Sequence, residues 1–293
     1  TLVLTGGNFI INDIITSDRS TDTSFNSDMA FSTGSTVVLN AQNTYYGNTF
    51  IDTNTTVQNG ISDALPTDTV LTLGSGNTNG TLDLNGFNQT LAGLTTSGTG
   101  TANLITTSAA GTGTSVLTVN NDTTTSNANY TYGGALQDGA TAHIALVKSG
   151  DHTLTLTGNS NTYSGGTTVQ GGTLAVNNTS GSGTGSGSVT VDSGGVLSGS
   201  GIIAPDIDSG VTIADGGQHI ASSTGNGMFN LFARYFNAKA STIPYKKRFN
   251  GWRSRPDRDD TWYERERMAF LIAALDSDDE ENFGKHPGSF KRE

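Results

Sequence analysis

Short runs in which apolar residues alternate with hydroxyl residues recur along the first three quarters of the chain. The pattern is clearest between Gly150 and Gly201, in the runs 153–157, 167–169, 173–176 and 188–191. Alternation with a period of two is typical of a strand with one buried and one solvated face. Each run is too short to bury enough surface alone, so we expect copies to stack on one another. The pattern therefore predicts the rungs of a parallel β-solenoid.

Two internal repeats support stacking. The heptad N-T-Y-x-G-x-T occurs at 43–49 and again at 161–167, each time after a predicted strand. The run VTVDSGG at 189–195 returns as VTIADGG at 211–217, 22 residues later. That spacing fits one turn of a solenoid, which needs roughly 20–25 residues for its strands and corners, and predicts about ten turns over residues 1–220.

The residue types fit a stack of this kind. Inward Val, Leu and Ile would pack between turns, while outward Thr keeps β-propensity without exposing hydrocarbon. Gly and Asn recur where the chain must turn through positive φ, and Asn at equivalent corners can form ladders along the stack. Tyr45 and Tyr163 of the two heptads are expected to pack in the core or on a corner.

Charge divides the chain into two regions. Residues 1–220 contain two basic residues, fifteen Asp and no Glu, whereas residues 221–293 contain thirteen Lys or Arg, eleven acids and both Trp residues. The first region is poor in helix-forming residues, and we interpret it as the solenoid. Disorder is the alternative for so polar a segment, but the regular alternation of Val, Leu and Ile argues against it. Residues 221–293 form a discordant tail.

The tail has helical patterns near 228–238 and 262–275, the second opened by a capping box at 261–264. Three explanations of the tail are open: a cap on the last turn, a separate module, or an out-of-frame or fused extension. Basic residues are interleaved with aromatic ones at 245–255 and could bind nucleic acid or an anionic surface. A solvated linker is the alternative, and the acidic run 276–281 would neutralise the basic patch. We predict no nucleic acid partner.

No catalytic, cofactor-binding or metal-binding residues are predicted. The four histidines at 143, 152, 219 and 286 are scattered without metal-ligand spacing. Asp206 and Asp208 flank Ile207 and could share an exposed face, as carboxylates of polysaccharide-cleaving β-helices do, but we interpret them as solvated turn acids. The chain has no cysteine and no run long and apolar enough for a transmembrane segment. An enzyme is therefore not expected.

The segment LVKSG at 146–150, followed by 153–176, resembles the autotransporter-associated β-strand repeat of bacterial surface proteins. The likeness lies in the order T-L-T-L-T-G, N-T-Y-x-G-x-T and G-T-L, with one extra residue at 158–160. The resemblance covers roughly residues 35–217 and is strong in the order of its motifs. The segment 69–101, with LDLNGFNQT at 82–90, resembles the region that accompanies this repeat. The resemblance implies a right-handed parallel β-helix that is secreted or displayed on a Gram-negative-type bacterium. It implies a stalk or adhesin-like passenger without catalytic residues.

A complete autotransporter would also carry a signal peptide and a C-terminal translocator barrel, and neither pattern occurs in these residues. The route of export and attachment is therefore open. The expected partners are a host or neighbouring-cell surface, a glycan or matrix. The alternative function is a carbohydrate-active or carbohydrate-binding β-helix that uses surface Asp residues.

Overall fold

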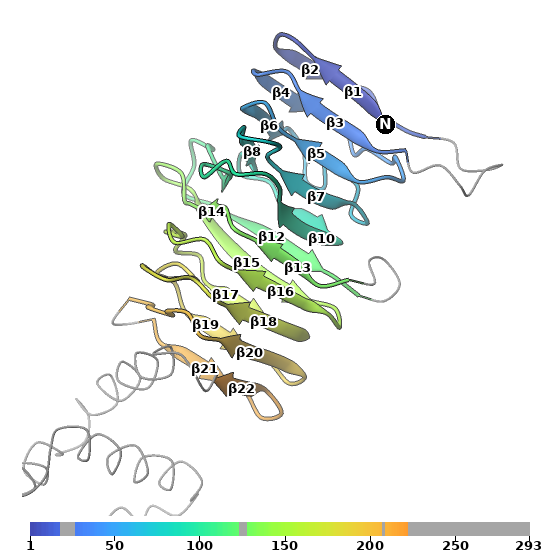
Figure 1. The fold of residues 1–293 in the computed structure, drawn as a ribbon. Helices are drawn as coiled ribbons and strands as arrows, with labels where there is room; N and C mark the ends of the chain where they lie inside the picture. The colour runs from blue at the N-terminus through green and yellow to red at the C-terminus, as the bar shows by residue number, and fades with distance from the viewer. Residues whose placement is uncertain (18–26, 123–127, 207–208, 222–293) are drawn as a thin grey trace, which may run out of the picture. The chain divides into compact units, whose positions relative to one another are not determined.

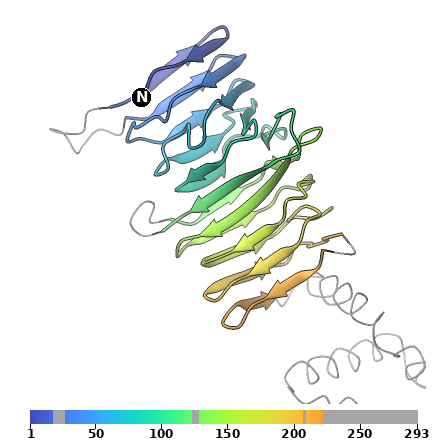
Figure 2. The same cartoon turned by 180° about the vertical axis from the view of Figure 1, so that it is seen from behind.

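The computed structural model describes residues 1–17, 27–122, 128–206 and 209–221. These residues contain 22 strands and no helix, and the chain coils through about nine turns (Figure 1). The view from behind shows the same stack of strands from its other face (Figure 2). No helix in this part of the chain is long and apolar enough to cross a membrane. The predicted all-β parallel solenoid is confirmed.

Every strand pairs in parallel with the strand one turn away, which gives four sheets. The first sheet contains β1 (Leu2–Thr5), β3 (Met29–Ser32), β5 (Thr49–Ile51), β7 (Val70–Leu73) and β10 (Gly93–Thr96). The second contains β2 (Phe9–Ile11), β4 (Thr36–Leu39), β6 (Thr55–Asn59), β8 (Gly80–Asp83), β11 (Leu104–Thr106) and β14 (Ala135–Leu136).

The third sheet contains β9 (Gln89–Leu91), β12 (Thr114–Asn120), β15 (His143–Ser149), β17 (Thr167–Val169), β19 (Val189–Val191) and β21 (Val211–Ile213). The fourth contains β13 (Tyr130–Tyr132), β16 (Thr153–Leu156), β18 (Gly172–Val176), β20 (Gly195–Gly199) and β22 (Gln218–Ala221). The fourth sheet continues the first, because Thr95 Oγ1 in β10 donates to the carbonyl of Thr131 in β13 at 3.0 Å. The third sheet begins with β9 and the second ends with β14, so both are present only in the middle of the stack. Each turn there has three strands.

The register explains the alternation in the sequence. Val189 of β19 lies between Thr167 of β17 and Val211 of β21, so the 22-residue repeat is one turn of the coil. Inward positions of successive turns form apolar columns, of which Val37, Val57, Leu82, Ile105 and Leu136 make one that is fully buried. Each such side chain contributes roughly 1.5–3 kcal/mol when it is buried. The core is therefore a continuous column shared by neighbouring turns.

The expectation that threonines face outward is only partly right. Thr49 and Thr69 are buried, and their Oγ1 atoms lie 2.8 Å apart in a hydrogen bond between turns. A buried hydroxyl is tolerated because its partner in the next turn supplies the bond that water would otherwise make. Threonine therefore occurs at inward as well as outward positions of the coil.

Two features of the prediction remain untested. The hand of the coil stays a prediction, as does the division of the chain at residue 220. The predicted helices near 228–238 and 262–275 lie outside the described residues, and so does the basic and aromatic segment 245–255.

Candidate functional site

The first asparagine of each heptad forms hydrogen bonds to the turn before it and to the turn after it. Asn161 Oδ1 accepts from the backbone N–H of Leu136 in the preceding turn, and its Nδ2 donates to the carbonyl of Gly183 in the following turn, both at 2.8 Å. Asn43 makes the same pair of bonds with the turns on its two sides, at 2.7 Å each. Both side chains are buried. The heptad asparagine therefore joins its turn to both neighbouring turns, by pairing with backbone groups that the strand ladders leave without a partner.

The heptad tyrosines are buried as predicted. Tyr163 Oη lies 2.6 Å from Thr167 Oγ1, and Tyr45 makes the equivalent contact with Thr49 at 2.7 Å. Burial raises the pKa of both phenols, and the hydrogen bond to threonine opposes that rise. Because these hydroxyls are paired inside the core, they are not available for chemistry at the surface.

Lys148 is a core residue that faces inward. In the register it occupies the place that valine takes in the turns before and after, Val119 and Val169, and its side chain is fully buried. Its Nζ donates to three backbone carbonyls, those of Ser149 at 2.5 Å, Gly150 at 3.1 Å and Gly171 at 3.1 Å.

Burial lowers the pKa of Lys148 to about 8, although nearby Asp151 opposes the shift. An ammonium has three donors, and each of them is used here. The side chain thus fastens the corner between β15 and β16 to the corner of the next turn. A lysine at this position replaces an apolar core residue by a hydrogen-bonding one.

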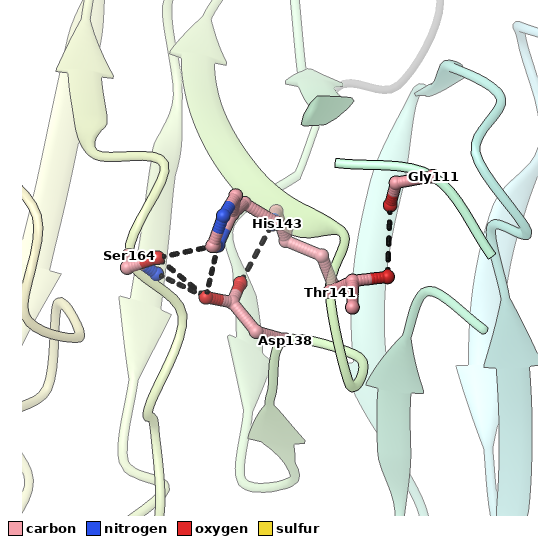
Figure 3. A network of polar contacts seen from close by, with 6 residues as sticks. Gly111, Asp138, Thr141, His143 and Ser164 are labelled. Carbon is pink, nitrogen blue, oxygen red and sulfur yellow. Dashed lines mark hydrogen bonds and ion pairs between the residues drawn. The ribbon is translucent and has the colours of Figure 1, made fainter. Parts of the chain in front are cut away.

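A polar cluster lies at the corner where β15 begins (Figure 3). Asp138 comes from the segment between β14 and β15, His143 is the first residue of β15, and Ser164 belongs to the heptad of the next turn. Asp138 Oδ2 lies 3.0 Å from His143 Nδ1, 2.5 Å from Ser164 Oγ and 3.0 Å from the Ser164 backbone nitrogen. Asp138 Oδ1 accepts from the Ile144 backbone N–H at 2.7 Å.

The composition of this cluster suggests a hydrolytic triad, but its geometry differs. In a triad the histidine bridges the other two residues through its two ring nitrogens. Here Ser164 Oγ, at 2.8 Å, and the carboxylate both meet the same nitrogen, Nδ1 of His143. The carboxylate also takes the serine hydroxyl directly, so the histidine is not placed between base and nucleophile. The arrangement joins two turns and does not activate Ser164.

Hydrogen bonds favour the ionised form of Asp138. Partial burial would raise the pKa of Asp138, but donors from Ser164, His143 and Ile144 outweigh it and hold this pKa below its usual value. Thr141 on the same corner donates to the carbonyl of Gly111 in the preceding turn at 3.0 Å. The corner is thereby attached to the turns on both sides of it (Figure 3).

The structure separates the other histidines and acids that the sequence singled out. His152 lies on the corner before β16, and His219 lies in β22, where burial lowers its pKa. Asp206 is exposed beyond β20, while Asp208 and His286 lie outside the described residues. Within the described ranges, no group of three or more His, Cys, Asp or Glu side chains could hold a metal ion.

A cavity of about 300 Å³ lies at the first turn. Its lining includes the apolar side chains of Leu2, Ile15, Met29 and Tyr45 together with one carboxylate, Asp28. Asp28 Oδ1 accepts from the backbone N–H of Asn48 at 2.9 Å, so this acid is already engaged. Among the described residues that line it, the cavity has no arrangement of catalytic groups.

Sequence reasoning missed the roles of Lys148 and Asp138. Lys148 belongs to the strand run 146–149, and the alternation of that run places residue 148 on the inward side. This alternation could have identified Lys148 as a core residue. Asp138 gave no such signal, because its partner Ser164 is 26 residues away and only the coil brings them together.

Comparison with known proteins supports the repeat assignment. Residues 146–176 match the family model of the passenger-associated-transport-repeat. The match runs from β15 through the second heptad to the end of β18, and it includes Lys148 and Ser164. No curated protein and no solved structure matches the chain.

Proposed function

We propose that this chain is a non-catalytic structural segment of a bacterial passenger protein, a stalk or adhesin-like rod that is secreted or displayed at the surface of a Gram-negative-type cell. The observation that carries the proposal is the passenger-associated repeat at 146–176, whose strands pair with strands of the solenoid on both sides. The same ladder continues on both sides of the repeat, so the segment acts as one part of a longer stack.

The uses of the motif residues support a structural role. Lys148, Asn161 and Tyr163 all bond to backbone or side-chain groups of the coil itself. A binding or catalytic motif would instead leave polar groups directed outward. In this repeat, the distinctive polar residues are accounted for by holding turns together.

Surface charge narrows the class of partner. Lys148 is the only Lys or Arg among the described residues, and it is buried. The surface of the described residues is acidic and exposes no lysine or arginine, which disfavours nucleic acid and anionic membranes as partners of this part of the chain. The proposed partners are therefore a host or neighbouring-cell surface, a glycan or matrix.

A display experiment tests the proposal. An epitope tag is inserted between Gly6 and Gly7, two exposed residues where a Cβ would meet no neighbouring atom, in the complete gene in its own bacterium. Surface display predicts antibody labelling of intact cells and loss of the label after external protease. Deletion of the coil should then reduce attachment to cells or matrix. Labelling seen only after lysis would refute surface display, and unchanged attachment would refute the adhesive part alone.

A further inference from the structure

Several exposed corners of the solenoid carry the triplet Asn-x-Ser/Thr. This triplet is the acceptor sequence for attachment of a sugar to asparagine in surface-exposed loops of secreted proteins. Four such asparagines are exposed: Asn54, Asn88, Asn129 and Asn177. The chain is rich in Asn and Thr, so the triplet alone carries little weight, and the argument depends on how these side chains are held.

All four side chains use their oxygen and leave their nitrogen unbonded. Asn88 and Asn129 each accept through Oδ1 from a backbone N–H of the next turn at 2.8 Å. Asn177 accepts from the Ser200 N–H at 3.0 Å, and Asn54 accepts from the Asn79 N–H at 3.3 Å. Among the described residues no acceptor is bonded to Nδ2 of these four side chains. The oxygen fixes the side chain, and the nitrogen faces no partner.

We propose that Asn54, Asn88, Asn129 and Asn177 are N-glycosylation acceptors. The co-substrate would be a sugar activated as a phosphate ester, either nucleotide-linked or lipid-linked. Nδ2 forms a bond to the anomeric carbon, the bond from that carbon to the phosphate oxygen breaks, and the proton of Nδ2 passes to a base of the transferase. The product is still a neutral amide whose Oδ1 can keep its bond to the next turn.

This compatibility distinguishes the four from a neighbouring acceptor triplet. Asn178 is also followed by Thr-Ser, but it is buried, and its Nδ2 donates to the carbonyls of Ser180 and Gly181 at 2.9 and 3.1 Å. A sugar on this nitrogen would replace one of its two hydrogens, so at least one of these bonds would break, and the buried side chain leaves no space for the sugar. The structure therefore predicts that Asn178 stays unmodified although Asn177 beside it is modified.

Asn159 supplies the opposite control. It is exposed, and its Oδ1 accepts from the backbone of Thr179 at 2.7 Å, in the same arrangement as the four acceptors. It is followed by Ser-Asn and so lacks the acceptor triplet. If geometry and triplet are both required, Asn159 stays bare.

The test uses the purified full chain with a bacterial asparagine glycosyltransferase and its nucleotide-activated hexose, followed by site mapping with mass spectrometry. We expect hexose on the four exposed asparagines and none on Asn178 or Asn159. Thr179→Ala should abolish modification of Asn177 alone, because it removes the triplet there. Ser200→Ala should leave that modification in place, because the backbone N–H of residue 200 remains.

Synthetic peptides that span the four triplets show whether the enzyme is competent. Modification of the peptides without modification of the folded chain would overturn the proposal, and so would equal modification of Asn159. In a second arm, the protein is isolated from the surface of its own bacterium. Sugar at the four sites supports the proposal, whereas a displayed but unmodified protein overturns it and leaves the proposed surface function intact.

Discussion

Replacement of Lys148 by methionine tests whether the buried ammonium stabilises the corner between β15 and β16. Folding lowers the pKa of this lysine from an ordinary 10.5 to about 8, so the folded state disfavours the charged form. A shift of this size corresponds to about 3 kcal/mol of unfavourable free energy at pH 7, since one unit is about 1.4 kcal/mol. The three hydrogen bonds to carbonyls favour the charged form, so this shift is the balance that remains after they offset part of the cost of burial.

The pH dependence of stability measures this balance. Below pH 8 the ammonium is charged in both states, and the full cost is present. Between pH 8 and 10.5 the folded protein has lost the proton while the unfolded chain still holds it, so the cost fades and the wild-type protein gains stability. Methionine has no such dependence. Relative to Lys148→Met, the wild-type protein should therefore gain about 2 kcal/mol between pH 7 and about pH 9.5.

Urea unfolding followed by far-UV circular dichroism measures this difference. Tyrosines 45, 132 and 163 also titrate at high pH, but their contribution cancels because both proteins contain them. Gln170→Met, an exposed change in the adjoining turn, serves as the control and should follow the wild-type pH profile. A stability difference between wild type and Lys148→Met that stays constant across this range would contradict the assignment of a buried, charged lysine.

Three further changes test the turn-to-turn contacts by the same unfolding assay. Tyr163→Phe removes the buried bond to Thr167 and should cost about 1 kcal/mol; an unchanged midpoint would mean that this bond contributes nothing. Gly185→Ala should cost about 3 kcal/mol, since residue 185 has φ +67° and a Cβ there would lie 2.0 Å from the Tyr163 carbonyl oxygen. Gly111→Ala, whose Cβ would meet no neighbouring atom, is the control and should leave the free energy of unfolding unchanged. Asp138→Asn should cost about 1 kcal/mol at pH 7. That difference should shrink as the pH falls below about 3.9, because a carboxylate with a lowered pKa loses its stabilising effect when it is protonated; a constant difference would exclude the charged acceptor.

The solenoid could be predicted from sequence because its two determinants are local. Alternation over three to five residues identifies a strand, and a repeat of 22 residues identifies one turn, as Val189 and Val211 show. The burial of Tyr45 and Tyr163 followed from the same reasoning, since each stands in a repeated motif between strands. These features depend on short segments that can be compared within one chain.

Contacts across turns could not be predicted in this way. The bonds of Asp138 to Ser164 and of Thr141 to Gly111 depend on which corners the coil superimposes, and corner lengths vary between turns. The change from two to three strands per turn in the middle of the stack was equally hidden, because the strands β9 and β11 look like any others in sequence. The role of the inward Lys148 could not be predicted either, because the sequence does not show which carbonyls its Nζ would contact.

The even register of the ladder has a consequence for length. Thr167 pairs with Val189 as Val189 pairs with Val211, so along β17, β19 and β21 the two strand edges that a turn presents to its neighbours are nearly equivalent. Duplication or loss of a whole turn would bring the same surfaces together again, whereas insertion of one residue in a strand would invert its inward and outward sides. The reach of such a rod can therefore change by whole turns through simple gene duplication, without any new interface having to evolve.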